Sequence, residues 1–491
     1  MDSNYLFKFA LLIAVFVFGG SFLCSCSRSF ESQESSTNSW KETPIPKTQT
    51  TKSVFKPTLQ LLTITNTPNP QTPTSTPETR IFYVSKIGSD QNQGSFNLPW
   101  KTIQKAAETL VAGETVYIRG GIYNERVSVA YRDNSSGPYI TFINYPGESV
   151  ILDGTGIEIQ YGEGLFSIKE TDYVRVSGLQ VQHSNGAGIY VVNSNNIQID
   201  NNHTYDTVKS GIGIWSSTNV IVDGNEIALA CNSHQNYLAS EENISIAAGS
   251  SNVEVKNNYV HQAANIPDGY AGGEGINVKD GAHDIKVHNN IVHLDERLDG
   301  LPSNRLAYGL DGWTHETYNV SFYNNIAYNN RIGYVIESEM GGTVHDIYVY
   351  NNIAYNNGTG FLIPNWVQNE TSLKRNVYFV NNTSYKNTTG FNINSVKIEN
   401  IVIRNNIIWQ SGTAIRIGST VPTKQITTDH NLIGIDPKFV NPAIADFHLQ
   451  SGSPGIDSGS PLNAPGTDFD NNPRPKGTGY DIGAYEFIIS Q

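Results

Sequence analysis

The sequence predicts a right-handed parallel β-helix, a solenoid in which short strands stack turn upon turn. Between Gly188 and Asn406 one pattern recurs eight times: a strand of the type Gly-Ile-x-Ile, a short connection, a strand of the type x-Ile-x-Val, and a closing Asn-Asn or Gly-Asn. Apolar and polar residues alternate within each copy. Self-similarity at a period of 23 to 35 residues, combined with alternation of period two, indicates a β-solenoid. The closing asparagines are Asn202, Asn225, Asn258, Asn290, Asn325, Asn352, Asn382 and Asn406.

Stacking explains why the pattern repeats. Each strand is too short to bury a core alone, whereas stacked copies pair every strand with its neighbours and bury one apolar column. Asparagines at one corner can form a ladder of amide hydrogen bonds, and asparagine tolerates the left-handed backbone of a tight corner. A leucine-rich repeat would need its own leucine spacing and a helix, and a propeller would need antiparallel hairpins. The sequence shows neither.

Residues 1–26 form a predicted targeting segment. An apolar run after Lys8 is too short for a membrane span and is typical of a secretory signal. Leu23-Cys24-Ser25-Cys26 resembles the bacterial lipobox, which implies lipid attachment at Cys26, because the small Ser25 precedes it. An ordinary signal peptide is the alternative. With Cys26 lipidated, only Cys231 would remain, so no intrachain disulfide framework is expected.

Residues 27–79 are rich in Ser, Thr and Pro, and this composition predicts a disordered tether. The two segments together predict an extracellular protein that a lipid anchors to the bacterial cell surface. The net charge is −13 and the sequence has no arginine-rich run, which argues against a nucleic-acid partner. We expect a monomer.

The expected β-helix spans residues 80–435 and begins with a capping helix. Apolar residues at Ile103, Ala106, Ala107 and Leu110 give this helix one face that can cover the open end of the core. The stretch resembles the N-terminal cap of secreted β-helix proteins of the pectate-lyase-like superfamily.

Residues 436–491 form a predicted C-terminal cap. Asp436-Pro-Lys-Phe, Gly452-Ser-Pro-Gly-Ile-Asp and Asp481-Ile-Gly-Ala-Tyr-Glu-Phe resemble the terminal segment of secreted bacterial β-helix proteins of the choice-of-anchor type Q class. This resemblance implies a structural role. The aspartates of the segment are first of all turn formers.

The alternation also assigns residues to the outer face of the solenoid. One outward column reads Val192, Trp215, Ala247, Lys279, Asp311, Glu337, Pro364 and Asn394. Neighbouring turns are about 4.8 Å apart, so Lys279, Asp311 and Glu337 should lie side by side. The longest repeats fall here, and their extra residues can form loops that wall a cleft.

This cluster is the predicted site. Lys279, Asp311 and Glu337 are the candidate catalytic residues, and Glu274, Asp311 and Glu337 are the candidate ligands of a Ca²⁺ ion. A polysaccharide lyase removes the proton α to a uronate carboxylate while a cation neutralises that carboxylate. Two neighbouring carboxylates would raise the pKa of Lys279, which argues against this lysine as the base. The candidate substrate-binding residues are Trp215, Asn277, Trp313 and His315.

The same cluster is also compatible with a hydrolase or with a purely structural role. A glycoside hydrolase would use two carboxyls, and adjacent or alternate turns offer the spacings of retaining or inverting enzymes. A charge ladder that only sets register and solubility would use the same residues without chemistry.

Two short motifs resemble family 9 pectate lyases: Glu274-Gly-Ile-Asn-Val-Lys279 and Leu310-Asp-Gly-Trp313. Matched by strand phase, Glu274 takes one calcium-ligand position, but the catalytic lysine of the family falls at Val335. The ordered motif series of polygalacturonases is not found. The resemblance therefore implies superfamily membership and a carbohydrate substrate, but not the reaction.

Two functions follow as hypotheses. The first is a polysaccharide lyase-like enzyme that acts on an acidic glycan. The second is a non-catalytic β-helix for glycan binding or adhesion.

Overall fold

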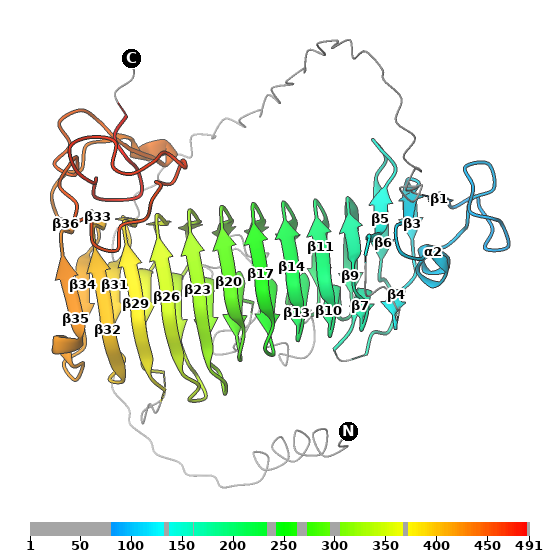
Figure 1. Ribbon diagram of the computed structural model, residues 1–491, viewed down its shortest axis with the longest axis horizontal. Coiled ribbons are helices and arrows are strands. Elements are labelled where there is room, and N and C mark those ends of the chain that lie inside the picture. The colour runs from blue at the N-terminus through cyan, green and yellow to red at the C-terminus, as the bar shows by residue number, and fades with distance from the viewer. Residues whose placement is uncertain are drawn as a thin grey trace, which may run out of the picture. The chain divides into compact units, whose positions relative to one another are not determined.

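The computed structural model describes residues 80–131, 137–160, 162–232, 242–262, 273–294, 305–366 and 372–488. Within them the chain forms a right-handed parallel β-helix built from sheets of 13, 12 and 11 strands, here called sheets A, B and C (Figure 1). Each full turn adds one strand to each sheet. The predicted fold class is therefore confirmed.

Sheet A consists of β1 (Ile81–Val84), β2 (Thr115–Ile118), β5 (Ile140–Asn144), β8 (Val174–Ser177), β11 (Asn195–Asp200), β14 (Thr218–Asp223), β17 (Ser251–Lys256), β20 (His283–His288), β23 (Thr317–Tyr323), β26 (Val344–Tyr350), β29 (Lys374–Val380), β32 (Ile398–Arg404) and β35 (Ile426–Asp429). Sheet B consists of β3 (Gly121–Tyr123), β6 (Val150–Asp153), β9 (Leu179–Ser184), β12 (His203–Thr207), β15 (Glu226–Ala228), β18 (Tyr259–His261), β21 (Ile291–His293), β24 (Ile326–Tyr328), β27 (Ile353–Tyr355), β30 (Thr383–Tyr385), β33 (Ile407–Trp409) and β36 (Leu432–Ile433). Sheet C consists of β4 (Val127–Ala130), β7 (Gly164–Lys169), β10 (Ala187–Val192), β13 (Ile212–Trp215), β16 (Ile244–Ala247), β19 (Ile276–Lys279), β22 (Leu306–Asp311), β25 (Ile332–Glu337), β28 (Thr359–Ile363), β31 (Thr389–Ile393) and β34 (Thr413–Ile417).

The register of sheet C follows the repeat of the sequence. Ile189 pairs with Ile212, Ile212 with Ile244, and Ile244 with Ile276. All four side chains are fully buried, so the apolar residue of each copy points into one shared core. The residues between them face outward, as the alternation predicts.

The predicted asparagine ladder lies at the corner between sheets A and B. The side-chain nitrogen of Asn325 donates to Asn352 Oδ1 at 3.1 Å, and the backbone N–H of Asn325 donates to the same oxygen at 3.0 Å. A side-chain bond of this kind links every rung of the ladder, from Asn202 to Asn431. The residue before most rungs, such as Asn289 with φ 55°, adopts the left-handed conformation.

A second, shorter ladder lies after sheet B. Asn330 donates to Asn357, and Asn357 donates to Asn387, again through both the backbone and the side chain. These residues follow the closing asparagines Asn325, Asn352 and Asn382 at a constant offset of five. The second ladder is therefore also visible in the sequence, although it lies outside the eightfold pattern described above.

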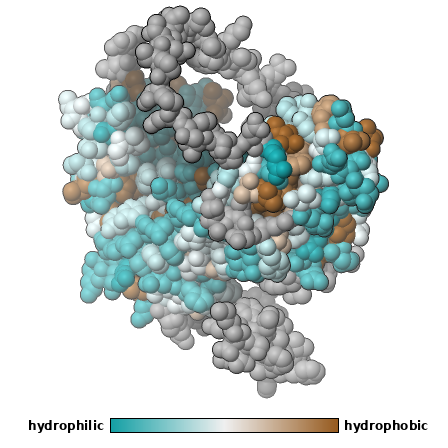
Figure 2. All heavy atoms as spheres, turned by 45° about the vertical axis from the view of Figure 1, so that its right-hand side comes forward, coloured by the Kyte–Doolittle hydropathy of each residue, from teal (hydrophilic) through white to brown (hydrophobic). Residues whose placement is uncertain are grey.

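The N-terminal helix α2 (Ile103–Thr109) starts where Thr102 Oγ1 accepts the backbone N–H of Lys105 at 3.1 Å. Its apolar face joins the core through Ile103, Ala106 and Ala107, so the predicted capping helix is present. Figure 2 turns this end toward the viewer and shows hydrophobic atoms in separate patches among hydrophilic ones. The exposed apolar side chains of this end include Ile87, Phe96 and Leu98.

The C-terminal segment caps the last turns from the side. Its antiparallel pair, β37 (Phe439–Asn441) and β38 (Asp446–Leu449), packs against Tyr385 and Ile407 of sheet B; 3₁₀ turns occur at Thr423–Gln425 and Pro442–Ile444. Asn405 donates to the carbonyl oxygen of Ser460 at 2.8 Å.

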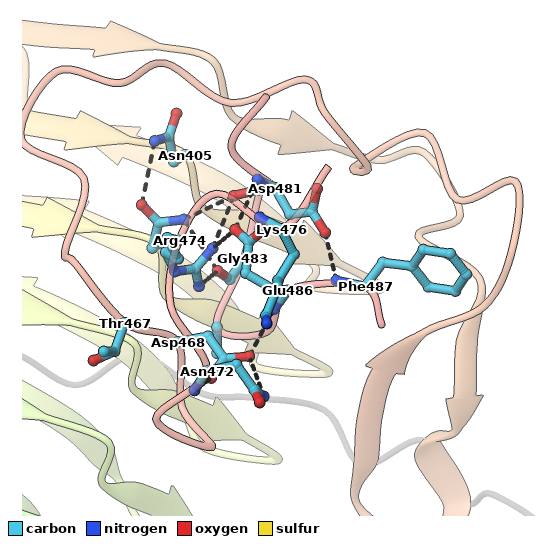
Figure 3. Close-up of polar contacts among 12 residues, drawn as sticks. Asn405, Thr467, Asp468, Asn472, Arg474, Lys476, Asp481, Gly483, Glu486 and Phe487 are labelled. Atoms are coloured by element: carbon cyan, nitrogen blue, oxygen red, sulfur yellow. Dashed lines mark hydrogen bonds and ion pairs between the residues drawn. The ribbon is translucent and has the colours of Figure 1, made fainter. Parts of the chain in front are cut away.

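Polar contacts hold the segment together (Figure 3). The fully buried Arg474 and Glu486 form an ion pair at 2.6 Å, and Arg474 also donates to the carbonyl oxygen of Gly483 at 2.8 Å. The carboxylate of Asp468 accepts the backbone N–H groups of Asn472 and Glu486. Asp468 therefore closes a turn, as the sequence predicts for the aspartates of this segment.

The predicted signal segment with Cys26 and the predicted tether lie outside the described residues. Cys231 is buried, and it forms no disulfide within the described chain. Over the described ranges, no helix has the length and apolar character needed to cross a membrane.

Candidate functional site

The outer face of sheet C brings Lys279, Asp311 and Glu337 together. Lys279 at the end of β19 pairs in register with Asp311 at the end of β22, and Asp311 pairs with Glu337 at the end of β25. Three successive turns therefore present one cation and two carboxyls in a row. We call this row and the neighbouring carboxyls of Glu242, Glu274 and Glu339 the carboxyl cluster.

Lys279 is held by Glu242, the residue two positions before β16. Its ammonium contacts Glu242 Oε1, while Glu242 Oε2 accepts the hydroxyl of Ser245 at 2.7 Å. Burial alone would lower the pKa of Lys279, but Glu242, Glu274 and Asp311 outweigh burial and raise it. Lys279 is therefore a fixed cation and is poorly suited to accept a proton.

Asp311 is anchored by the backbone. Its Oδ1 accepts the N–H of Trp313 at 2.7 Å and the N–H of Glu339 at 3.1 Å. The side chain is buried, and burial raises its pKa despite these two bonds and the charge of Lys279. The two bonds fix the carboxyl plane in relation to the end of the next strand.

Glu337 is the most strongly shifted carboxyl of the row. It is 4% exposed, and burial followed by the charges of Asp311 and Glu339 raises its pKa well above the ordinary value. The indole N–H of Trp366 donates to Glu337 Oε2. Trp366 itself is 46% exposed, so one residue joins a buried acid to the protein surface.

Two further carboxyls of the cluster also have raised pKa values. Burial and the charge of Glu242 raise the pKa of Glu274 to about 7, and burial together with Asp311 raises the pKa of Glu339. Carboxyls with raised pKa values keep their protons to a higher pH than ordinary carboxyls do. The cluster therefore combines carboxyls of raised proton affinity with a fixed cation.

Lys374 lies behind the row, at the start of β29 in sheet A. It is almost fully buried, and it donates to Ser372 Oγ at 2.9 Å. Burial lowers its pKa to about 8, an effect that the charges of Glu337 and Asp311 oppose. Strand alternation could not identify this lysine as a neighbour of Glu337, because it lies on a different sheet and in a later turn.

The calcium hypothesis needs three carboxyls around one point. Among the described residues, no group of three or more His, Cys, Asp and Glu side chains is arranged to hold a metal ion. The assignment of Glu274, Asp311 and Glu337 as Ca²⁺ ligands stays a prediction.

The candidate substrate-binding residues lie around the cluster. Trp313 lies 6.0 Å from the Lys279 ammonium, measured to the ring centroid. Trp215 and Asn277 lie on the outer face of sheet C, on β13 and β19. His315 is exposed, and its Nδ1 lies 2.6 Å from Asp280 Oδ1, so its described partner is outside the cluster.

Glu242 and Trp366 belong to the site but were not predicted from the sequence, whereas Glu339 is expected beside the row from its place just after Glu337. Glu242 and Glu274 occupy the same position in successive copies, two residues before Ile244 and Ile276, and that repetition was a usable signal. Trp366 follows β28, and its contact with Glu337 crosses between turns, which no local pattern reveals.

The chain is a right-handed parallel β-helix, and part of it is similar to pectate-lyase-like proteins of this fold. Residues 82–251 match the family model described as the Pel9A-like, right handed beta helix region. The structure of XylC with xylose superimposes with a TM-score of 0.53 and 14% identity, over 83% of this chain and 98% of that one. That likeness shows the fold alone.

Two curated proteins share sequence with the chain. The uncharacterized protein YwoF of Bacillus subtilis is 37% identical over 131 residues, which are 25% of this chain and 28% of that protein. Pectate lyase PEL9 of Emericella nidulans is 30% identical over 156 residues, 29% of this chain and 37% of that protein. The chain thus spans about a third of the length of these relatives. The family match also ends before Glu274, so it does not include most of the carboxyl cluster.

Proposed function

We propose that this protein is a carbohydrate-active enzyme that cleaves a polysaccharide by acid–base chemistry at the carboxyl cluster. The observation that carries the proposal is the pair formed by Asp311 and Glu337, two register partners that both have raised pKa values. Adjacent turns separate their backbones by about 4.8 Å, close to the spacing of about 5 Å between the two carboxyls of retaining glycoside hydrolases.

In this proposal Glu337 is the proton donor. A buried carboxyl that keeps its proton near neutral pH can protonate the leaving oxygen of a glycosidic bond. Asp311 is the partner carboxylate on the neighbouring turn. Its two backbone N–H bonds hold it in place, and the charge of Lys279 favours its ionised form. Lys279 is then an electrostatic partner and not a base.

A second candidate is a polysaccharide lyase acting on an acidic glycan. The match of residues 82–251 to the Pel9A-like model and the similarity to pectate lyase PEL9 favour it. A uronate chain would meet several carboxyls here, so this candidate requires a cation such as Ca²⁺ to neutralise the substrate.

Residues 80–491 would be incubated with neutral polysaccharides and with uronate polymers, with added Ca²⁺ and with a chelator. New reducing ends without ultraviolet absorbance, lost in Glu337→Gln and in Asp311→Asn, are expected for hydrolysis. Absorbance from unsaturated ends that needs Ca²⁺ would instead identify a lyase. Binding of a glycan without any cleavage would overturn both and identify a non-catalytic β-helix.

We also propose that the enzyme works outside the cell, held by a lipid on Cys26 and a tether of residues 27–79. The signal-like N-terminus and the Ser/Thr/Pro-rich composition support this location. Metabolic labelling with a fatty acid analogue should mark the wild-type protein and not Cys26→Ala. Equal labelling of both would contradict it.

A further inference from the structure

A second feature of sheet C lies several turns before the carboxyl cluster. A cavity of about 210 Å³ opens beside β7 and β10, and its lining includes Glu163, Asn185, Tyr190 and Lys209. Tyr190 lies on the same outward column as Asn277, three strands earlier in the order of the sheet. The cavity and the cluster therefore share one face of the solenoid.

An aromatic pair marks the edge of this cavity. The rings of Tyr190 and Trp215 lie 6.3 Å apart at an angle of 39°. Gly213 makes the pair possible, because a Cβ atom there would approach the Tyr190 ring to 2.9 Å. Within the described chain the buried Trp215 Nε1 has no hydrogen-bond partner. A buried donor without a partner is costly, and a ligand that accepts a hydrogen bond removes that cost.

Asn277 lies on β19, the strand that ends at Lys279 of the carboxyl cluster. It is 4% exposed, and its Oδ1 has no hydrogen-bond partner among the described residues. Gly309 on the next strand leaves room for this amide, because a Cβ atom there would lie 2.8 Å from Asn277 Cγ. One free donor on β13 and one free acceptor on β19 suit hydroxyl groups, which donate and accept.

The face is different from β25 onward, on the strand that carries Glu337 and on the strand after it. At the positions that follow Asn277 and Gly309 in the same outward column, β25 and β28 carry Val335 and Leu362. These two side chains form a buried apolar group with Leu306 and Ile332. Packed apolar side chains fill the outer face there, and they offer no hydrogen bonds to a sugar.

We infer that the substrate is an extended glycan chain that runs from the carboxyl cluster toward the N-terminal turns only, that Asn277 lines the subsite beside the cluster, and that Trp215 and Tyr190 form its distal subsites. This inference rests on the proposed function of the cluster. Trp215 lies three strands from Asp311, about 14 Å, and one pyranose unit is roughly as long as one strand spacing. The chain must therefore extend several sugar units to one side of the cleaved bond, with the apolar group blocking the other side.

Binding would be measured on Glu337→Gln, so that cleavage does not interfere. The probes are size-fractionated oligogalacturonides, xylo-oligosaccharides and galacto-oligosaccharides of two to eight units, and the readouts are calorimetry and tryptophan fluorescence. For at least one series we expect affinity to rise with length until the distal subsites are filled. Trp215→Ala should weaken binding of the long chains at least fivefold and leave that of the dimers unchanged. Asn277→Ala, only one strand from Asp311, should weaken binding of every length.

Asn392→Ala is the matched control. Asn392 belongs to the same outward column and also has an Oδ1 without a partner in the described chain, but it lies on β31, beyond the apolar group. It should not affect binding of any length. Equal losses in Asn392→Ala and Asn277→Ala, affinity independent of length, or no binding in any series would overturn the inference. If Trp215→Ala does not fold, Trp215→Phe takes its place, because phenylalanine keeps an aromatic ring and removes the indole N–H. If length-dependent binding holds while the wild type cleaves nothing, only the proposed function fails.

Discussion

Lys279 and Glu242 form an ion pair between adjacent turns of the solenoid, although 37 positions separate them in the sequence. Both side chains are largely shielded from water, with 17% and 3% exposure. Attraction between such charges offsets their loss of hydration, so each one depends on the other. The pair fixes the cation against which the carboxyls of the site are arranged.

Removing one partner of this pair should destabilise the protein. We expect Lys279→Met to lower the free energy of unfolding by about 3 kcal/mol, because Glu242 would be left as a buried charge without compensation. Denaturant titration followed by circular dichroism measures the loss. The double variant Lys279→Met, Glu242→Gln should recover most of it. Equal stability of the single and the double variants would show that the pair has no such role.

Glu274 should make stability depend on pH. Its pKa is about 7 in the folded chain and about 4.3 in an unfolded one, so the folded state holds an extra proton between these values. The stabilising effect of this proton is full below pH 4.3 and is lost as pH rises through 7. Relative to Glu274→Gln, the wild type should lose about 2 kcal/mol between pH 4.5 and 7.5, after allowance for partial exposure. Parallel stability curves for the two proteins would contradict this assignment.

Trp366→Phe should move the pH dependence of cleavage. The indole N–H favours the ionised form of Glu337, and phenylalanine keeps a ring without that donor. The acid would hold its proton to higher pH, so the alkaline limb of the kcat profile should shift upward by about one pH unit. Trp409→Phe on β33 is the control and should leave the profile unchanged. A downward shift in Trp366→Phe would refute the role of Glu337 as proton donor.

The asparagine ladder should be sensitive at its buried rungs only. Asn325→Ala removes bonds to Val287, Asn352 and Asn290 within the core and should cost about 3 kcal/mol. Asn289→Gly changes the corner residue that directly precedes the neighbouring rung Asn290. Glycine adopts the positive φ of this residue freely, so stability should change by no more than about 0.5 kcal/mol. Similar losses in both variants, measured by thermal denaturation, would argue against the ladder as the source of stability.

The C-terminal segment should depend on its buried ion pair. Arg474→Met leaves Glu486 buried without its partner and should expose the segment to limited proteolysis. Lys476→Met, at an exposed position of the same loop, should be cut no faster than the wild type. Unchanged proteolysis of Arg474→Met would mean that apolar packing on sheet B suffices to hold the segment.

The fold could be predicted because each copy carries its own evidence. The closing asparagines and the alternating isoleucines report a local backbone geometry, and eight repetitions identify the register as well. The row Lys279, Asp311 and Glu337 followed from that register alone. Stacking geometry thus connects a sequence pattern directly to a row of side chains.

The rest of the site depends on contacts that no repeat encodes. Trp366 reaches Glu337 from the connection after β28, and Lys374 approaches the row from sheet A. Both lie where the chain leaves one strand and enters the next, and there the conformation is set by packing across turns. The proton affinities of the carboxyls also depend on how deeply each one is buried. A strand pattern shows only whether a side chain points inward or outward, and not its degree of burial.

Every rung of the asparagine ladder offers the same donor to the turn after it and the same acceptor to the turn before it. A whole turn of three strands can therefore be duplicated or deleted without leaving an unpaired donor or acceptor in the ladder. Gene segments that encode one turn behave as interchangeable units of length. A turn inserted between β13 and β19 would move Trp215 away from Asp311 by one strand spacing, and ancestral duplications of this kind offer evolution a stepwise means of changing how many sugars separate the two.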